Sequence, residues 1–267
     1  MKDVNNIAII TTVNNLFLYK KTVNFFPNNI KLFVIDGSYG LFGLNSIKFM
    51  FRKLKKHKIK WLIMVDEDVI FVNPQNIFDI INNMKIEGTD VCGIRDGGVL
   101  EWRDKNPYLI NPFFCILNIK KIYSIYSESD FLENQYIQDN EFDDDLSELE
   151  YPFDEKSLFE DYYCFFLWLR RKQMKFKFLK AYGGDFENDL ETTTVIGSDN
   201  KILLYHTWYA RTYGLNKYHT TRIDNVIVKG NIQKGFNQKK IIYFKNYYYL
   251  INKSIRKIYN KFSNLFK

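Results

Sequence analysis

Apolar residues along the chain gather in short runs that are separated by segments of mixed polarity. The short runs have the length and the content of β-branched and aromatic residues that are typical of buried strands. They lie at residues 7–13, 30–35, 61–65, 90–94, 113–118, 175–180 and 201–205. Helical spacing is found between them at residues 44–56, 73–84 and 158–171, and from residue 120. This alternation predicts an α/β fold with a mostly parallel sheet flanked by helices.

Two of the predicted helices have recognisable start signals. Asn73 and Pro74 suit the N-cap and the first helical position. Ser157 and Glu160 match a capping box in front of the apolar run LFEDYYCFFLWLRR. No internal repeat and no Pro/Gly/Ser-rich linker interrupts the chain before its basic end. We therefore expect one domain over residues 1–228 and a tail over residues 229–267.

The charge of the chain is concentrated in that tail. The whole chain carries +7 at neutral pH, whereas residues 229–267 contain nine Lys, one Arg and no acid, which gives +10. The rest of the chain must then carry −3 (7 − 10). From Lys239 onward, apolar and aromatic residues alternate with basic ones at a spacing that predicts a basic amphipathic helix. Such a helix suits an anionic membrane surface. A helix packed on the domain with its lysines in water explains the pattern equally well.

The cysteines and the apolar runs place limits on the cellular context. Cys92, Cys115 and Cys164 are odd in number and mostly set among apolar residues, which predicts reduced core thiols and no disulfide or zinc site. No run approaches the roughly 20 apolar residues of a membrane span, and the first apolar run is too short for a signal peptide. We expect a cytoplasmic protein, at the inner face of the cell membrane if the tail binds there.

An acidic triplet, Asp66-Glu67-Asp68, stands between two apolar runs. Three carboxylates in such a position are costly unless their charge is compensated. In an extended chain Asp66 and Asp68 point to one side and Glu67 to the other. Two hard oxygen donors so placed suit Mg²⁺ or Mn²⁺, ions that often take substrate phosphates as further ligands. A solvated acidic turn at the end of a strand is the alternative interpretation.

Other polar side chains fall at predicted strand ends. Thr11 lies near the end of the first strand, Asp36 opens a Gly-containing loop after the second, and His206 follows the last. Strand ends that open into such loops are where open α/β sheets bind ligands. The imidazole of His206 suits Mn²⁺ better than Mg²⁺, although a hydrogen-bonded core histidine is the other interpretation.

Taken in chain order, four motifs resemble the GT-A-fold nucleotide-sugar glycosyltransferases, in particular the inverting, family 2-like branch. They are VIDGS with Asp36, the DxD-type triplet at residues 66–68, the Glu160-Asp161 pair before YYCFFLWLRRKQMKFKFL, and His206 after a late strand. The resemblance covers about residues 7–219. The stretch NPFFCILNIK also resembles the retaining, family 8-like enzymes, so the stereochemical outcome stays open.

The resemblance implies a GT-A-type, Rossmann-like mixed sheet and a metal-dependent enzyme. Such an enzyme transfers a sugar from a nucleotide-sugar donor, most often a UDP-sugar, to a glycan or lipid-linked acceptor, here in surface polysaccharide biosynthesis. By the same resemblance Thr11 and Asp36 would contact the nucleoside, and Asp161 would be the general base. Asp68 would bind the metal, and Asp66 would bind the ribose or reach the metal.

Several further assignments follow from chemistry. His206 is expected as a third ligand to Mn²⁺ or Mg²⁺. Arg211 and Lys217 follow it in the chain and are expected to pair with the donor diphosphate, although solvation alone explains Lys217.

The main alternative to an enzyme is a non-catalytic basic α/β protein that binds nucleic acid or a membrane. A nucleotidyltransferase would also use paired aspartates with Mg²⁺. A binding module does not need Asp66, Asp68, Asp161 and His206 together, so their combination favours the glycosyltransferase. We therefore expect no nucleic-acid partner.

Overall fold

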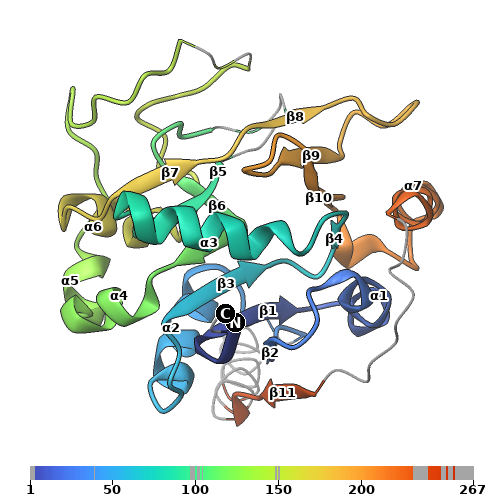
Figure 1. The fold of residues 1–267 in the computed structure, drawn as a ribbon, viewed down its shortest axis with the longest axis horizontal. Coiled ribbons are helices and arrows are strands. Elements are labelled where there is room, and N and C mark those ends of the chain that lie inside the picture. Colours follow the sequence, from blue (N-terminus) through green and yellow to red (C-terminus); the bar gives the residue numbers. More distant parts are fainter. Residues whose placement is uncertain are drawn as a thin grey trace, which may run out of the picture.

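A mixed sheet lies at the centre of the computed structural model, which describes residues 4–38, 40–96, 100, 103, 105–147, 149, 151–230, 240–247, 251 and 255. Within these residues the sheet has seven strands: β1 (Ile7–Val13), β2 (Lys31–Asp36), β3 (Trp61–Val65), β5 (Val91–Arg95), β6 (Ile110–Leu117), β7 (Phe176–Phe178) and β11 (Ile241–Phe244). Their order is β11-β2-β1-β3-β6-β5-β7 (Figure 1). Only β6 runs antiparallel to its neighbours in this described sheet. The predicted α/β fold with a mostly parallel sheet is therefore confirmed.

A smaller antiparallel sheet packs beside the first. Over the same described residues it contains four strands, in the order β4-β10-β9-β8. They are β4 (Val69–Phe71), β8 (Ala181–Gly183), β9 (Thr193–Ile196) and β10 (Ile202–His206). Because β3 ends at Val65 and β4 begins at Val69, the chain passes from one sheet to the other through the acidic triplet.

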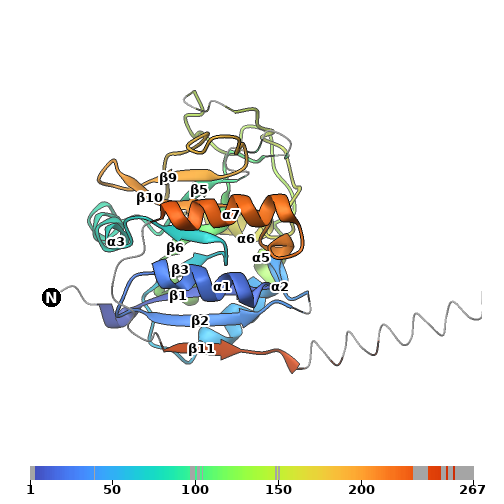
Figure 2. The same cartoon turned by 90° about the vertical axis from the view of Figure 1, so that its right-hand side faces the viewer.

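Helices cover both faces of the main sheet (Figures 1 and 2). The α-helices are α1 (Leu16–Thr22), α2 (Gly43–Leu54), α3 (Asn76–Glu87), α4 (Ile119–Ile125), α5 (Glu128–Leu132), α6 (Tyr163–Arg171) and α7 (Lys217–Lys229). Short 3₁₀ turns are η1 (Val4–Asn6), η2 (Val23–Phe25) and η3 (Ala210–Thr212). Ile7 and Ile9 of β1 pack in one core cluster with α3 and the small sheet, and Ala8 and Ile10 pack in another with α2, α4 and α6. This alternation along β1 is the pattern of a strand buried on both faces.

Two helix starts differ from the sequence prediction. α3 begins at Asn76, three residues after the expected N-cap. α6 begins at Tyr163, so the predicted capping box is wrong. The reason is that its two side chains are engaged elsewhere: Ser157 Oγ accepts from the N–H of Phe159 at 3.3 Å, and Glu160 pairs with Arg103.

Several elements were not predicted at all. These are β4, β8, β9, α1, α5 and α7. The strands among them are three or four residues long, which is too short for a clear alternation of polarity. The three cysteines are buried free thiols, as expected. No helix among the described residues has the length and apolar character that crossing a membrane requires.

The largest departure concerns the expected amphipathic helix from Lys239. Residues Ile241–Phe244 instead form β11, parallel to β2 at the edge of the main sheet (Figure 2). The new strand adds apolar side chains to both faces of the sheet. Ile242 and Phe244 pack on the face that α2 covers, and Ile241 packs on the opposite face. A stretch of the predicted tail therefore completes the sheet of the domain. Much of the remaining tail, including residues 231–239 and 256–267, lies outside the described residues.

The contact of β11 with the core yields a stability prediction. The ring of Phe244 stacks on Phe33, with centroids 5.4 Å apart and planes at 15°. Replacing Phe244 by Ala should lower the free energy of unfolding by about 1–3 kcal/mol, since it is half-buried against the core. Tyr247→Ala is the control, because this side chain is 67% exposed and should change stability by about 0.5 kcal/mol or less. Equal urea midpoints for both variants would show that β11 does not contribute to the core.

Candidate active site

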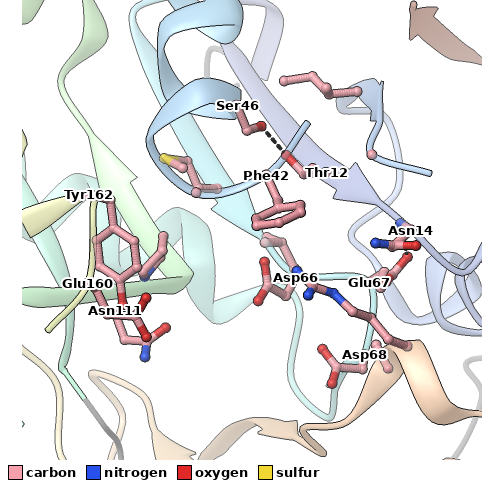
Figure 3. Close-up of a pocket in the computed structure, with 18 of the residues that line it drawn as sticks. Thr12, Asn14, Phe42, Ser46, Asp66, Glu67, Asp68, Asn111, Glu160 and Tyr162 are labelled. Carbon is pink, nitrogen blue, oxygen red and sulfur yellow. Dashed lines mark hydrogen bonds between the residues drawn. The ribbon is translucent and has the colours of Figure 1, made fainter. Parts of the chain in front are cut away.

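A cleft of about 700 Å³ opens at the carboxyl ends of β1, β2 and β3 (Figure 3). It is lined by Thr12 near the end of β1, by Gly37 directly after β2, and by the acidic triplet after β3. The start of α2, the turn before α6 and the chain after β10 form its walls. The carboxyl edge of parallel strands is where the sequence predicted a ligand site.

The acidic turn is held between the two sheets. The N–H of Asp66 donates to the carbonyl of Phe113 on β6, at 2.9 Å. On the other side, the N–H of Thr207 donates to the carbonyl of Asp68 at 3.2 Å. Because both ends of the turn are bonded to different sheets, its two aspartates have a fixed position relative to both.

His206 reaches this turn through the pairing of β10 with β4. The two strands are antiparallel, and His206 lies opposite Val69, the residue that follows Asp68. His206 Nε2 is 3.3 Å from Asp68 Oδ1, and both side chains are buried. The imidazole stacks on Phe113, with centroids 4.1 Å apart, and its Nδ1 has no hydrogen-bond partner within the described part of the chain.

Asp66, Asp68 and His206 form a candidate metal site. Each offers a ligand atom, and these atoms lie within 4.8 Å of one another. Burial, and after it the charge of Asp68, raises the pKa of Asp66 to about 6. A divalent cation would relieve the repulsion between the carboxylates, and two oxygens with one imidazole nitrogen suit Mn²⁺ or Mg²⁺. The residues present therefore fit such an ion.

Glu67 takes a different role from its neighbours. Its carboxylate accepts hydrogen bonds from the N–H groups of Asn14 and Asn15, at 2.7 and 2.8 Å, just before α1. Burial raises the pKa of Glu67 to about 8, against the effect of these two donors. The Thr22 hydroxyl also donates to the Glu67 carbonyl, at 2.7 Å. Glu67 thus ties the acidic turn to α1.

Asp161 lines the cleft at the start of α2. Its Oδ1 accepts from the N–H of Leu44 at 3.1 Å, where the helix dipole favours a negative charge. Gly43 makes this approach possible, because a Cβ at that position would lie 2.5 Å from Asp161 Oδ1. Gly43 also has φ of +55°, a conformation that other residues rarely adopt. The bond uses one oxygen of the carboxylate and fixes its orientation.

Glu160 belongs to a buried polar network that the sequence did not reveal. It pairs with the guanidinium of Arg103, and burial raises the pKa of Glu160. Behind them the fully buried Asp96 accepts from the Asn111 amide at 2.9 Å and from the Tyr162 hydroxyl at 2.8 Å. This network fixes the turn before α6, and hence the wall of the cleft that carries Asp161. The signal in the sequence was an aspartate two residues after the predicted strand at residues 90–94.

The chain after His206 closes one side of the cleft in an unusual backbone conformation. Trp208 and Tyr209 have φ of 58° and 59°, which is uncommon for bulky residues. The Trp208 ring lies against His206, with centroids 4.3 Å apart, and its indole N–H donates to the Thr193 hydroxyl at 3.0 Å. Arg211 follows, and its guanidinium lies over the ring of Phe42, 4.4 Å from the centroid.

The remaining predicted residues are placed unevenly. Arg211 lines the cleft, and its charge lowers the pKa of Asp66 slightly against the larger effect of burial. Thr11 is fully buried, and Thr12 on the opposite side of the strand lines the cleft instead and bonds to Ser46. Asp36 accepts from the N–H of Ser38 at 3.1 Å and stands between two cleft residues without lining the cleft itself. Lys217 is the exposed first residue of α7 and does not line the cleft.

Comparisons with known proteins add little to this picture. No protein-family model matches the sequence, and no curated protein matches it. A solved structure that matches part of the chain is the mannosyltransferase PcManGT from Pyrobaculum calidifontis, in complex with GDP-Man and Mn²⁺. The TM-score is 0.30 at 7% sequence identity, over 45% of this chain and 46% of that chain. The match spans less than half of either protein, so the interpretation of the cleft rests on its own geometry.

The metal site gives a direct prediction. Mn²⁺ should raise the melting temperature of the wild-type protein by several degrees when it is well above its dissociation constant. Asp68→Asn and His206→Gln should each abolish most of this rise, because the first removes a negative charge from the ligands and the second removes the imidazole nitrogen. Glu160→Gln removes a carboxylate from the same cleft but not from the three ligands, and should keep the rise. Scanning fluorimetry measures all four proteins, and an undiminished rise in both ligand variants would refute the site.

The raised pKa of Asp66 gives a prediction for the metal-free protein. The folded-state pKa lies above that of the unfolded chain, so the folded state binds more protons and loses stability as the pH rises through the interval between them. In EDTA and at a pH above this interval, Asp66→Asn should raise the melting temperature by a few degrees. At a pH below the interval the rise should be much smaller. The exposed Asp143→Asn should show no such dependence. If Asp66→Asn destabilises the protein at high pH, burial does not control this carboxylate.

Proposed function

We propose that the protein is a metal-dependent glycosyltransferase that moves a sugar from a nucleotide-sugar donor to an acceptor hydroxyl. The observation that carries the proposal is the convergence of Asp66, Asp68 and His206 in a cleft whose wall also holds Asp161. A volume of about 700 Å³ lies within the range of small-molecule sites and can hold a nucleotide-sugar. A purely structural acidic turn would need neither the histidine nor the cleft.

The donor side of the cleft follows from the strand ends. Asp66, Asp68 and His206 would hold Mn²⁺ or Mg²⁺, which supplies charge neutralisation for a diphosphate leaving group. Thr12 and Gly37 lie where the nucleoside would fit, with Asp36 adjacent. Arg211 is placed to leave the face of Phe42 and pair with phosphate oxygens, for which a guanidinium is well suited. A UDP-sugar is the first donor to test.

The acceptor side follows from Asp161. A general base must hold its carboxylate within reach of the acceptor hydroxyl, and the bond from the N–H of Leu44 fixes one oxygen while leaving the second as an acceptor. Direct displacement by the activated hydroxyl would invert the configuration at the sugar. We propose a glycan or lipid-linked acceptor, as in surface polysaccharide biosynthesis.

Replacement of the proposed base separates binding from catalysis. Asp161→Asn should keep the thermal stabilisation by Mn²⁺ with a nucleotide-sugar, because the amide keeps the size of the side chain. It should release nucleoside diphosphate from the donor about 10²–10⁴-fold more slowly, because the amide cannot take the proton. The measurement is a panel of UDP-, GDP- and CMP-sugars, first by scanning fluorimetry and then by release of the nucleotide.

Glu160→Gln is the matched control, one residue away in the same wall. It should keep most of the turnover, since the Glu160 carboxylate is paired with Arg103. If Glu160→Gln loses turnover and Asp161→Asn does not, the base is Glu160. If no nucleotide-sugar stabilises the wild-type protein with Mn²⁺, the proposed function is wrong.

A further inference from the structure

Two basic segments that are far apart in the sequence adjoin at the outer edge of the main sheet. Residues 37–65 contain seven Lys and Arg and no acid, and residues 229–267 carry +10. His57 of the first segment packs against Phe33 and Phe244, with centroids 4.8 and 6.0 Å away, which brings the turn after α2 onto β11. The proposed function uses none of the Lys and Arg side chains of either segment.

The exposed lysines of this region define what we call the basic edge. Ile241 pairs with Leu32, so Lys240 of β11 comes level with Lys31 of β2. The basic edge consists of Lys31, Lys55, Lys56, Lys58, Lys240 and Lys245, all of them exposed. None of the six forms an ion pair with another described residue. An unpaired set of like charges at one edge attracts an anionic partner.

Apolar side chains extend this surface beyond β11. Tyr247, Ile251 and Ile255 are each in helical conformation and are 67%, 57% and 57% exposed. Residues four apart in a helix lie on the same side. Large aliphatic side chains next to a basic surface are typical of segments that enter the headgroup region of a bilayer, whereas single-stranded nucleic acids are bound mainly by aromatic stacking.

One end of this surface lies at the same edge of the sheet as the cleft. β11 is parallel to β2, with Phe244 opposite Ile35, and the chain leaves β11 at the carboxyl edge of the sheet. Ile35 and Gly37 line the cleft at that same edge. Lys245 and Tyr247 therefore lie at the carboxyl edge, on the side where the cleft opens, whereas Lys31 and Lys240 stand at the amino ends of their strands.

We propose that the basic edge, together with Tyr247, Ile251 and Ile255, docks on an anionic lipid bilayer. The lysines attract the headgroups, and the two isoleucines enter the apolar boundary below them. Attachment in this manner is reversible and weakens with salt. It holds the outer edge of the sheet, formed by β11 and β2, against the headgroups. If the proposed function holds, on which this one step rests, attachment favours an acceptor held in the same bilayer.

Sedimentation with vesicles tests the docking without any donor or metal. The full-length protein should sediment with phosphatidylglycerol-containing vesicles at low salt, and not with pure phosphatidylcholine vesicles or at high salt. The double variants Lys55→Glu/Lys56→Glu and Ile251→Glu/Ile255→Glu should each bind about tenfold more weakly or worse. Their melting temperatures and their response to Mn²⁺ should match the wild-type protein, since none of the four residues lines the cleft.

Matched controls separate this surface from charge and polarity in general. Lys180→Glu/Lys201→Glu makes the same change of charge at exposed lysines of the small-sheet region, and Ile86→Glu/Leu190→Glu changes two other apolar residues that are 76% and 85% exposed. Both controls should sediment like the wild-type protein. Equal loss in controls and test variants would overturn the proposal, and so would a wild-type protein that ignores anionic vesicles at low salt. Binding of a labelled single-stranded RNA through Lys55, Lys56 and Ile251 in place of vesicles would assign the surface to nucleic acid and refute it.

Discussion

The antiparallel pairing of β4 with β10 is the constraint on which the candidate site depends. It sets His206 opposite Val69 and so brings an imidazole from late in the chain against Asp68, 3.3 Å away. The same pairing places the acidic turn at the junction of two sheets, where it is bonded to Phe113 on one side and to Thr207 on the other. The carboxylates of Asp66 and Asp68 repel each other in a largely buried position, and the framework holds them together against that repulsion. The site is therefore a property of how two sheets are joined rather than of one loop.

Much of the fold followed from sequence because its long elements have strong patterns. The runs at residues 7–13 and 61–65 were recognisable as buried strands, and the alternation with helices indicated the parallel arrangement. The prediction failed where tertiary structure outweighed local pattern. The segment around Ile242 has residues that suit either a strand or an amphipathic helix, and only the free edge of β2 decides between them. The capping box failed in a similar way, since Arg103 lies 57 positions from Glu160 in sequence yet binds it.

The candidate metal ligands could be named from the sequence, whereas the residues that hold the site in place could not. Asp66, Asp68 and His206 are chemically distinctive residues at strand ends, which is why they could be named in advance. Thr11 was named although Thr12 is the hydroxyl that lines the cleft, because the parity of a strand cannot be read when both of its faces are buried. The network around Asp96 depends on an arginine in the loop before β6, an asparagine on β6 and a tyrosine just before α6. No spacing rule connects them.

The strand β11 also has a consequence for the order in which the protein can assemble. Its partner β2 is separated from it by about 200 residues, and such distant pairings form late because closing the intervening loop costs entropy. Until then β2 is an open edge, with unpaired backbone groups that invite pairing with other chains. Lys31 and Lys240 also come together only when this last strand is in place. The basic edge is thus a product of completed folding, and a chain that is still unfinished cannot present it.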